Sequence, residues 1–242
     1  TRVRSSAASD VYKRQIPLSP HELQVRPLSP SLDAAPIYTR LIQLLRQKPL
    51  DPRIEDLIAD LGSPTASAEE ISDLQRMLTE RRDVMALLHQ ATDRPSCLFH
   101  RDWTRGAGVV FPEQSVLRKA ARLLWAESDL LARQGRYQEA IANQARGFRI
   151  AEHAASDPVV TAYLVGIACE DLALDGMRNI LYLSGDKPGI AEAIREAIAS
   201  RRPHLSLQHA LEGDLVMTRV TLTWLRWDGA PGLIEFFSDS WE

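Results

Sequence analysis

Residues 118–155 read RKAARLLWAESDLLARQGRYQEAIANQARGFRIAEHAA and indicate the architecture of the chain. Apolar residues recur every three or four positions on both sides of a short segment that begins Gly135-Arg136-Tyr137. This period is typical of amphipathic helices, because residues three and four apart share one face of a helix. The stretch therefore predicts two helices packed back to back around a tight turn.

Helix signals continue on both sides of this hairpin. Asp33 is placed to cap a helix that ends before Pro49, and Ser67 with Glu70 fits a capping box. The expected helices span residues 33–48, 51–62, 67–88, 112–134, 137–155, 158–184, 188–201 and 203–227. Proline, glycine or aspartate separates them, and no alternating strand pattern competes. The sequence therefore predicts an all-α fold of about eight helices, packed as antiparallel hairpins in a solenoid-like array.

The chain divides into three expected parts. Residues 1–15 resemble translated sequencing-adapter read-through, so we expect a non-native or disordered segment. Residues 16–32 contain four prolines and are expected to form a linker or tether. Residues 33–242 are expected to form a single all-α domain. An N-terminal signal or membrane anchor lost with the natural start would place the protein in the cell envelope or outside the cell; otherwise it is expected in the cytoplasm.

Charge and hydropathy exclude two classes of partner. The formal net charge is −3, and residues 1–15 hold four of the 29 basic and one of the 32 acidic residues, so the remainder carries −6. Nucleic-acid binders need an excess of Lys and Arg, so we expect no nucleic-acid partner. No apolar stretch reaches the roughly 18–20 residues that span a membrane. Cys97 and Cys169 could form at most one disulfide, and the redox compartment stays undetermined.

The hairpin at 118–155 resembles a tetratricopeptide-type helical hairpin. Its matching positions are the turn residues, the small residue where the helices cross, and the large and small residues of the first helix: Gly135, Tyr137, Ala140, Leu124, Ser128 and Leu131. It departs from the pattern at Gln144, where an aromatic residue is usual, and at Pro158, which comes later than the closing proline of that family. The match covers about forty residues, and no second copy at the family's spacing of about 34 residues is convincing.

A wider resemblance covers the order of the helical hairpin, the Arg101-Asp102-Trp103 loop and the start at Asp33. This order is similar to that in uncharacterised proteins of environmental bacteria. It implies no activity. Several of those proteins begin with an apolar anchor, which is consistent with the tether interpretation of residues 16–32.

The tetratricopeptide resemblance implies a binding face. In that family the first helix lines a concave groove, and Arg122, Trp125, Asp129 and Arg133 occupy the matching groove-facing positions. They are therefore candidates for contact with a protein or peptide partner. In the alternative, Asp129 and Arg133 form a surface ion pair four residues apart, and Trp125 packs on a neighbouring helix.

The longest irregular segment expected inside the domain is 93–111. Loops of this length are more often functional or disordered, and this one has enough apolar residues to pack over the helices. Arg101, Asp102 and Trp103 are candidate binding residues; in the alternative, Arg101 pairs with Asp102 and Trp103 is buried. Cys97 and His100 would suit a nucleophile and a base, or part of a metal site, but no orienting group or second ligand pair is evident.

Two classes of function remain. No phosphate-binding glycine loop, nucleophile elbow or zinc-protease motif occurs, so we expect no cofactor, no metal and no catalytic residue. We favour a non-enzymatic scaffold with a protein- or peptide-binding face. The alternative is an enzyme or small-ligand binder that uses loop 93–111 as a lid over a pocket between helices. A pocket that gathers Cys97, His100 and Asp102 would favour this alternative, whereas an open groove lined by the first helices of the hairpins would favour the scaffold.

Overall fold

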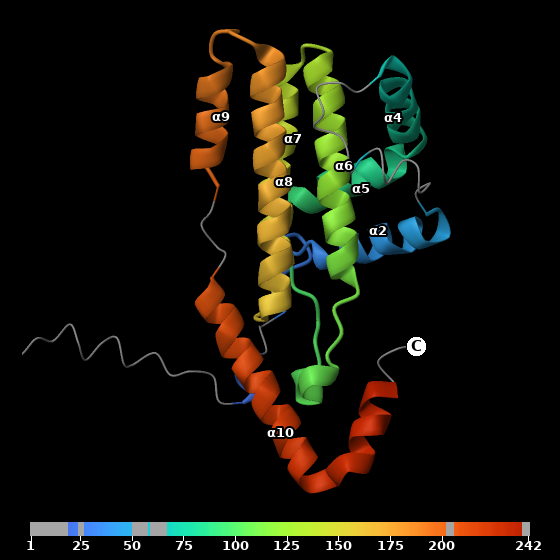
Figure 1. The fold of residues 1–242 in the computed structure, drawn as a ribbon, viewed down its shortest axis with the longest axis vertical. Helices are drawn as coiled ribbons and strands as arrows, with labels where there is room; N and C mark the ends of the chain where they lie inside the picture. The colour runs from blue at the N-terminus through green and yellow to red at the C-terminus, as the bar shows by residue number, and fades with distance from the viewer. Residues whose placement is uncertain (1–18, 24–26, 50–57, 59–66, 202–205, 239–242) are drawn as a thin grey trace, which may run out of the picture.

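The computed structural model describes residues 19–23, 27–49, 58, 67–201 and 206–238. These residues form eight α-helices and two short 3-10 helices, and no strand occurs among them (Figure 1). The predicted all-α class is therefore confirmed. Residues 1–15 and, apart from Ile58, the expected helix at 51–62 lie outside the described residues.

Three long helices form the centre of the molecule. α6 (Glu113–Arg133), α7 (Tyr137–Ala154) and α8 (Val160–Ser184) run antiparallel side by side, and α9 (Ile190–Ala199) covers α7 and α8 on the far side from α6 (Figure 1). Gly135 has a φ of 78°, a left-handed conformation that favours glycine, and this allows the tight turn between α6 and α7. The predicted hairpin is present, and its helix ends agree with the expected ones within a residue.

Three further helices lie on the other side of α6. α2 (Ala35–Gln47) begins one residue later than a cap at Asp33 predicts, because Ala34 stands at the N-cap position and makes no side-chain cap bond. The Asp33 carboxylate still accepts hydrogen bonds from the backbone nitrogens of Ala35 (3.0 Å) and Leu98 (2.9 Å). The second of these bonds also ties the start of α2 to the long loop. Buried apolar side chains from α2, α4, α5 and α6 form the largest core cluster.

The helix expected at 67–88 is two helices. The capping box is present, with Ser67 and Glu70 each accepting from the other's backbone nitrogen, but α4 (Ala68–Glu80) stops at Arg81 and α5 (Arg82–Thr92) begins a new direction. Arg81 has φ −108° and ψ 28°, outside the helical region, and its guanidinium donates to the carbonyl oxygens of Lys48 and Pro49. Because this anchor lies about thirty residues upstream, no local signal marked the break.

The C-terminal helix α10 (Leu207–Ser238) extends beyond the expected end at residue 227. It packs on the short helix η2 (Trp103–Gly108) and on the start of α8, and it bends in its last third (Figure 1). Gly213 lies directly against the backbone of Pro158, where a Cβ atom would collide with the carbonyl oxygen. Asp214 accepts a hydrogen bond from the backbone nitrogen of Val160 (3.2 Å), so α10 also caps α8.

Part of the expected linker belongs to the folded structure. η1 (Pro20–Leu23) places Leu23 against Trp103, Val159 and Val216, and Leu23 is 5% exposed. The tether interpretation is therefore wrong for this turn, because a single apolar residue docks it on η2 and α10. None of the described helices is both long enough and apolar enough to cross a membrane.

Candidate functional site

The face of α6 that carries the predicted groove residues is covered by α8. Trp125 is 5% exposed and lies against Gly176 of α8, together with Gln144 of α7. Gly176 makes this approach possible, because a Cβ atom there would overlap both side chains. A partner could reach Trp125 only by displacing α8, so the groove interpretation fails for this residue and the packing alternative holds.

Asp129 and Arg133 form the expected ion pair, but not at the surface. The Asp129 carboxylate, with 0% of its side chain exposed, accepts from Arg133 Nε (2.7 Å) and from Asn179 Nδ2 of α8 (2.7 Å). Arg122 is half-buried on the same side. Burial raises the pKa of the nearby Cys169 thiol to about 12, and the positive charges of Arg118 and Arg122 act in the opposite direction. The candidates therefore lie along the α6–α8 contact, not in an open groove.

An open groove lies on roughly the opposite face of α6. It has a volume of about 410 Å³ and is bounded by α4, α5 and α6. Apolar side chains line its floor, and polar and charged side chains its rim; the residues are Gln75, Leu78, Thr79, Arg82, Met85, Ala86, His89, Glu127, Leu130, Leu131, Gln134 and Arg136. Glu127, Leu130, Leu131 and Gln134 share one helical face of α6. Helical periodicity does not single out this face, because α6 also packs on α7 and α8 through its other faces.

The rim of this groove holds a small polar network. Glu127 Oε2 lies 2.8 Å from His89 Nε2 and accepts from Asn143 Nδ2 (2.5 Å). Arg82 is exposed and makes no ion pair with another described residue, whereas Arg136 pairs with Glu139 and thereby lowers the pKa of that carboxyl group. Arg82 therefore carries a positive charge that no described carboxylate neutralises.

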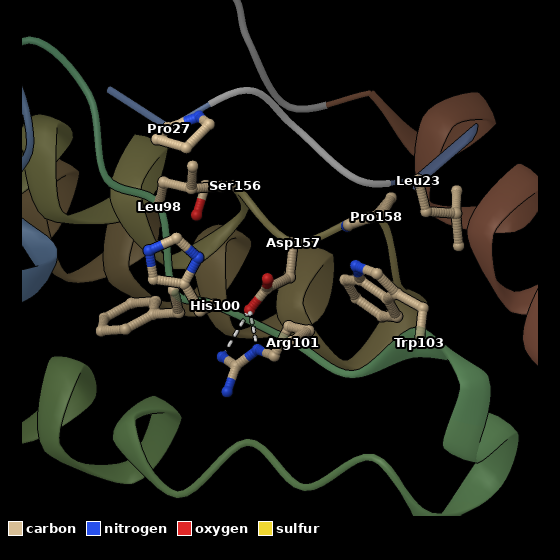
Figure 2. A pocket seen from close by; sticks show the side chains of 10 residues that line it. Leu23, Pro27, Leu98, His100, Arg101, Trp103, Ser156, Asp157 and Pro158 are labelled. Atoms are coloured by element: carbon tan, nitrogen blue, oxygen red, sulfur yellow. Dashed lines mark hydrogen bonds and ion pairs between the residues drawn. The ribbon is translucent and has the colours of Figure 1, made fainter. Parts of the chain in front are cut away.

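Loop 93–111 is fastened by Arg101 (Figure 2). Arg101 Nη2 pairs with Glu113 and lies 2.6 Å from Asp157 Oδ2, and the three side chains are only 7%, 5% and 4% exposed. The guanidinium also lies over the rings of Phe99 and Phe111, 5.3 and 4.7 Å from their centroids. The expected Arg101–Asp102 pair is absent: Asp102 instead accepts from the backbone nitrogen of Thr104 (3.1 Å) and starts η2.

Burial sets the ionisation of this cluster. It raises the pKa of Asp157, and the hydrogen bond and charge of Arg101 act in the opposite direction. Both carboxylates bind the same guanidinium, so Arg101 has little capacity left for a ligand. Trp103 is 4% exposed and packs beside Phe111, with ring centroids 6.3 Å apart, so the alternative of a buried Trp103 holds and the interpretation as a binding residue does not.

A second hollow, of about 320 Å³, lies between this loop and the turn from α7 to α8 (Figure 2). His100, Arg101 and Trp103 line it, as do Ser156 and Asp157. Cys97 and Asp102 do not. Cys97 is buried in the main core, and desolvation raises the pKa of its thiol far above the ordinary value. The grouping of Cys97, His100 and Asp102 that the enzyme alternative requires is therefore not formed in this hollow.

One further buried polar pair was not anticipated. His153 Nδ1 lies 3.0 Å from the Tyr38 hydroxyl, and its Nε2 lies 3.1 Å from the carbonyl oxygen of Arg94. A carbonyl only accepts, so the Nε2 proton is donated to Arg94 and the Tyr38 hydroxyl donates to Nδ1. Burial lowers the pKa of His153 to about 3, so the ring is neutral near neutral pH. The pair joins α2 to α7.

Neither the geometry nor the comparisons with known proteins assign a chemistry. Within the described ranges, no three His, Cys, Asp or Glu side chains are grouped to hold a metal ion. No protein-family model, curated protein or solved structure matches this chain.

Proposed function

We propose that this protein is a non-enzymatic helical scaffold that binds a peptide segment of a protein partner in the groove between α4, α5 and α6. The observation that carries the proposal is the groove itself, an open hollow of about 410 Å³ with an apolar floor and a polar rim. That volume lies within the usual range of about 300–1,000 Å³ for ligand sites. An amphipathic peptide helix would place one or two apolar side chains on such a floor.

The residues that line the groove support the same proposal. The groove lies on the face of α6 roughly opposite the positions that match the tetratricopeptide groove, so that resemblance does not bear on it. Met85 and Leu130 are nearly buried at the floor, whereas Leu78 and Leu131 are half-exposed and available for contact. The exposed Arg82 on the rim would attract a carboxylate. The expected ligand is therefore a segment with apolar anchors beside an Asp or Glu residue.

The alternative, an enzyme or small-ligand site under loop 93–111, has less support. The hollow there contains His100 but neither Cys97 nor Asp102, and Arg101 is held by two carboxylates. His100, Ser156 and Asp157 all line it, but the Ser156 hydroxyl donates to the carbonyl oxygen of His153 (2.8 Å) and Asp157 accepts from Arg101. Among the described residues, no hydrogen bond therefore links the three as nucleophile, base and orienting group.

The proposal can be tested with a phage-displayed library of random peptides, selected on the full chain. Ala86 is exposed in the groove, so Ala86→Trp should fill it; Ala142, exposed on α7 and outside the groove, supplies the matched control Ala142→Trp. We expect selected peptides to bind Ala86→Trp at least about tenfold more weakly and Ala142→Trp unchanged. We also expect Arg82→Glu to weaken peptides that contain an acidic residue. Failure to select any peptide, or equal affinity for Ala86→Trp, would exclude the groove as the binding face.

A further inference from the structure

α10 presents a row of leucines to solvent. Its opposite face is buried on η2 and α8 through Ala210, Gly213 and Val216. Leu211, Leu215 and Leu222, however, are 54%, 44% and 59% exposed. An isolated exposed leucine is ordinary, but several on one face of one helix form a patch of the kind that marks an interaction surface.

The spacing of this row is that of a coiled-coil seam. Leu211, Leu215, Thr218 and Leu222 follow one another at intervals of four, three and four residues, which is the alternation of a heptad core. The interval keeps all four side chains on one narrow stripe of the helix. Its natural occupant is therefore another helix with the same repeat.

Charges beside the stripe indicate which helix. Glu212 and Arg219 are seven residues apart and lie along the same edge of the stripe. The edge is thus acidic toward the start of α10 and basic further along. Arg219 makes no ion pair with another described residue, and Glu212 accepts only an amide hydrogen bond, from Gln208. When a second copy of the helix runs in the opposite direction, the acidic end of this edge lies beside the basic end of the same edge on the other copy.

A second copy of α10 in the antiparallel orientation would bury the leucines and pair the charges. With the pair centred between residues 216 and 217, Leu211 packs against Leu222 of the partner subunit, and Leu215 against the partner's Thr218. Glu212 then lies beside the partner's Arg219, and the two-fold axis repeats this pair. A parallel pair would instead place Arg219 near the partner's Asp214, which caps α8, and would leave Glu212 beside a leucine.

We propose that this protein self-associates through α10, with two copies packed antiparallel along Leu211, Leu215 and Leu222 and two Glu212–Arg219 pairs at the edges. The surface is separate from the proposed peptide groove, because α10 contributes no residue to that groove. Either proposal can therefore fail without the other.

The test is sedimentation equilibrium of the full chain over a wide concentration range. We expect the apparent mass to rise from 27.1 kDa toward twice that value. Glu212→Arg and Arg219→Glu should each weaken the dimer at least about tenfold, because each places like charges together, and the double exchange should restore it. Arg46→Glu, at an exposed position on α2, is the control and should change nothing. A chain that stays monomeric, or a dimer indifferent to both charge reversals, would overturn the proposal.

The orientation has its own test. Under mild oxidation, a mixture of Leu211→Cys and Leu222→Cys proteins should form a disulfide-linked dimer, whereas each protein alone should not. Cys97 and Cys169 are buried and do not interfere. Cross-linking of Leu211→Cys with itself would show a parallel pair and refute the proposed arrangement.

Discussion

Replacing Arg101 with methionine should destabilise the protein by about 3–5 kcal/mol at neutral pH, the usual cost of removing one partner from a buried ion pair. The change leaves Glu113 and Asp157 without their counter-charge, and their side chains are only 5% and 4% exposed. Methionine keeps an unbranched stem between Phe99 and Phe111, so little packing volume is lost. The expected loss is a large part of the about 5–15 kcal/mol that stabilises a typical domain.

The loss should depend on pH in a defined direction. Burial raises the pKa of Asp157 in the folded protein, and Arg101 opposes this effect. Without Arg101 the pKa of Asp157 must rise further. A carboxyl group whose folded pKa lies above its unfolded value stabilises the protein most at low pH, and this stability is lost as the pH rises through the folded pKa. The difference between the wild type and Arg101→Met should therefore shrink as the pH falls from 7 toward 4.

Urea denaturation followed by circular dichroism at several pH values would measure both effects. The triple variant Arg101→Met/Glu113→Gln/Asp157→Asn should recover much of the loss, because it removes the two carboxylates as well. The exposed pair of Arg136 and Glu139 supplies the control, and Arg136→Met should leave the midpoint unchanged. If Arg101→Met were as stable as the wild type, or if its loss of unfolding free energy did not depend on pH, then this cluster would not be what holds the loop in place.

Three further predictions follow from buried contacts. Trp103→Ala should destabilise the protein by roughly 3 kcal/mol, the scale for a buried aromatic residue, and trypsin should then cut at Arg105 in the loosened loop. In a variant that retains only Trp125, fluorescence should be blue-shifted and resistant to acrylamide quenching, because the ring is 5% exposed; strong quenching would reopen the α6–α8 face as a binding site. Gly213→Ala should cost about 1–3 kcal/mol despite the better helix propensity of alanine, because its Cβ meets the carbonyl oxygen of Pro158; a rise in melting temperature would contradict this contact.

The helices could be predicted because their signals are local. The capping box at Ser67 and the turn at Gly135 act within a few residues, and both helices start where those residues indicate. The break at Arg81 could not be predicted in this way, since its partners are the carbonyl groups of Lys48 and Pro49. A run of good helix-forming residues gives no sign that a distant contact interrupts it.

The candidate site was harder to predict for the same reason. A helical wheel sorts the residues of α6 into faces but does not say which neighbour covers each face, so Trp125 was assigned to a groove that α8 fills. Arg101 was recognised as a notable residue, yet its partners Glu113 and Asp157 lie 12 and 56 residues away. Only the adjacent Asp102 was visible as a partner in the sequence. Long-range charge pairs need the fold before they can be assigned.

The cluster around Trp103 joins the two ends of the described chain, because it contains Leu23 of η1 and Val216 of α10. During synthesis the helices from α2 to α9 are made before Val216, and domains fold as their residues emerge. Trp103 can therefore be buried only after α10 has been made. The same holds for the contacts of Gly106 with Thr221 and Met217. We expect trypsin to cut at Arg105 in a nascent chain stalled after α9, whereas the released protein should resist. Folding of the loop is therefore expected to finish only when α10 has formed.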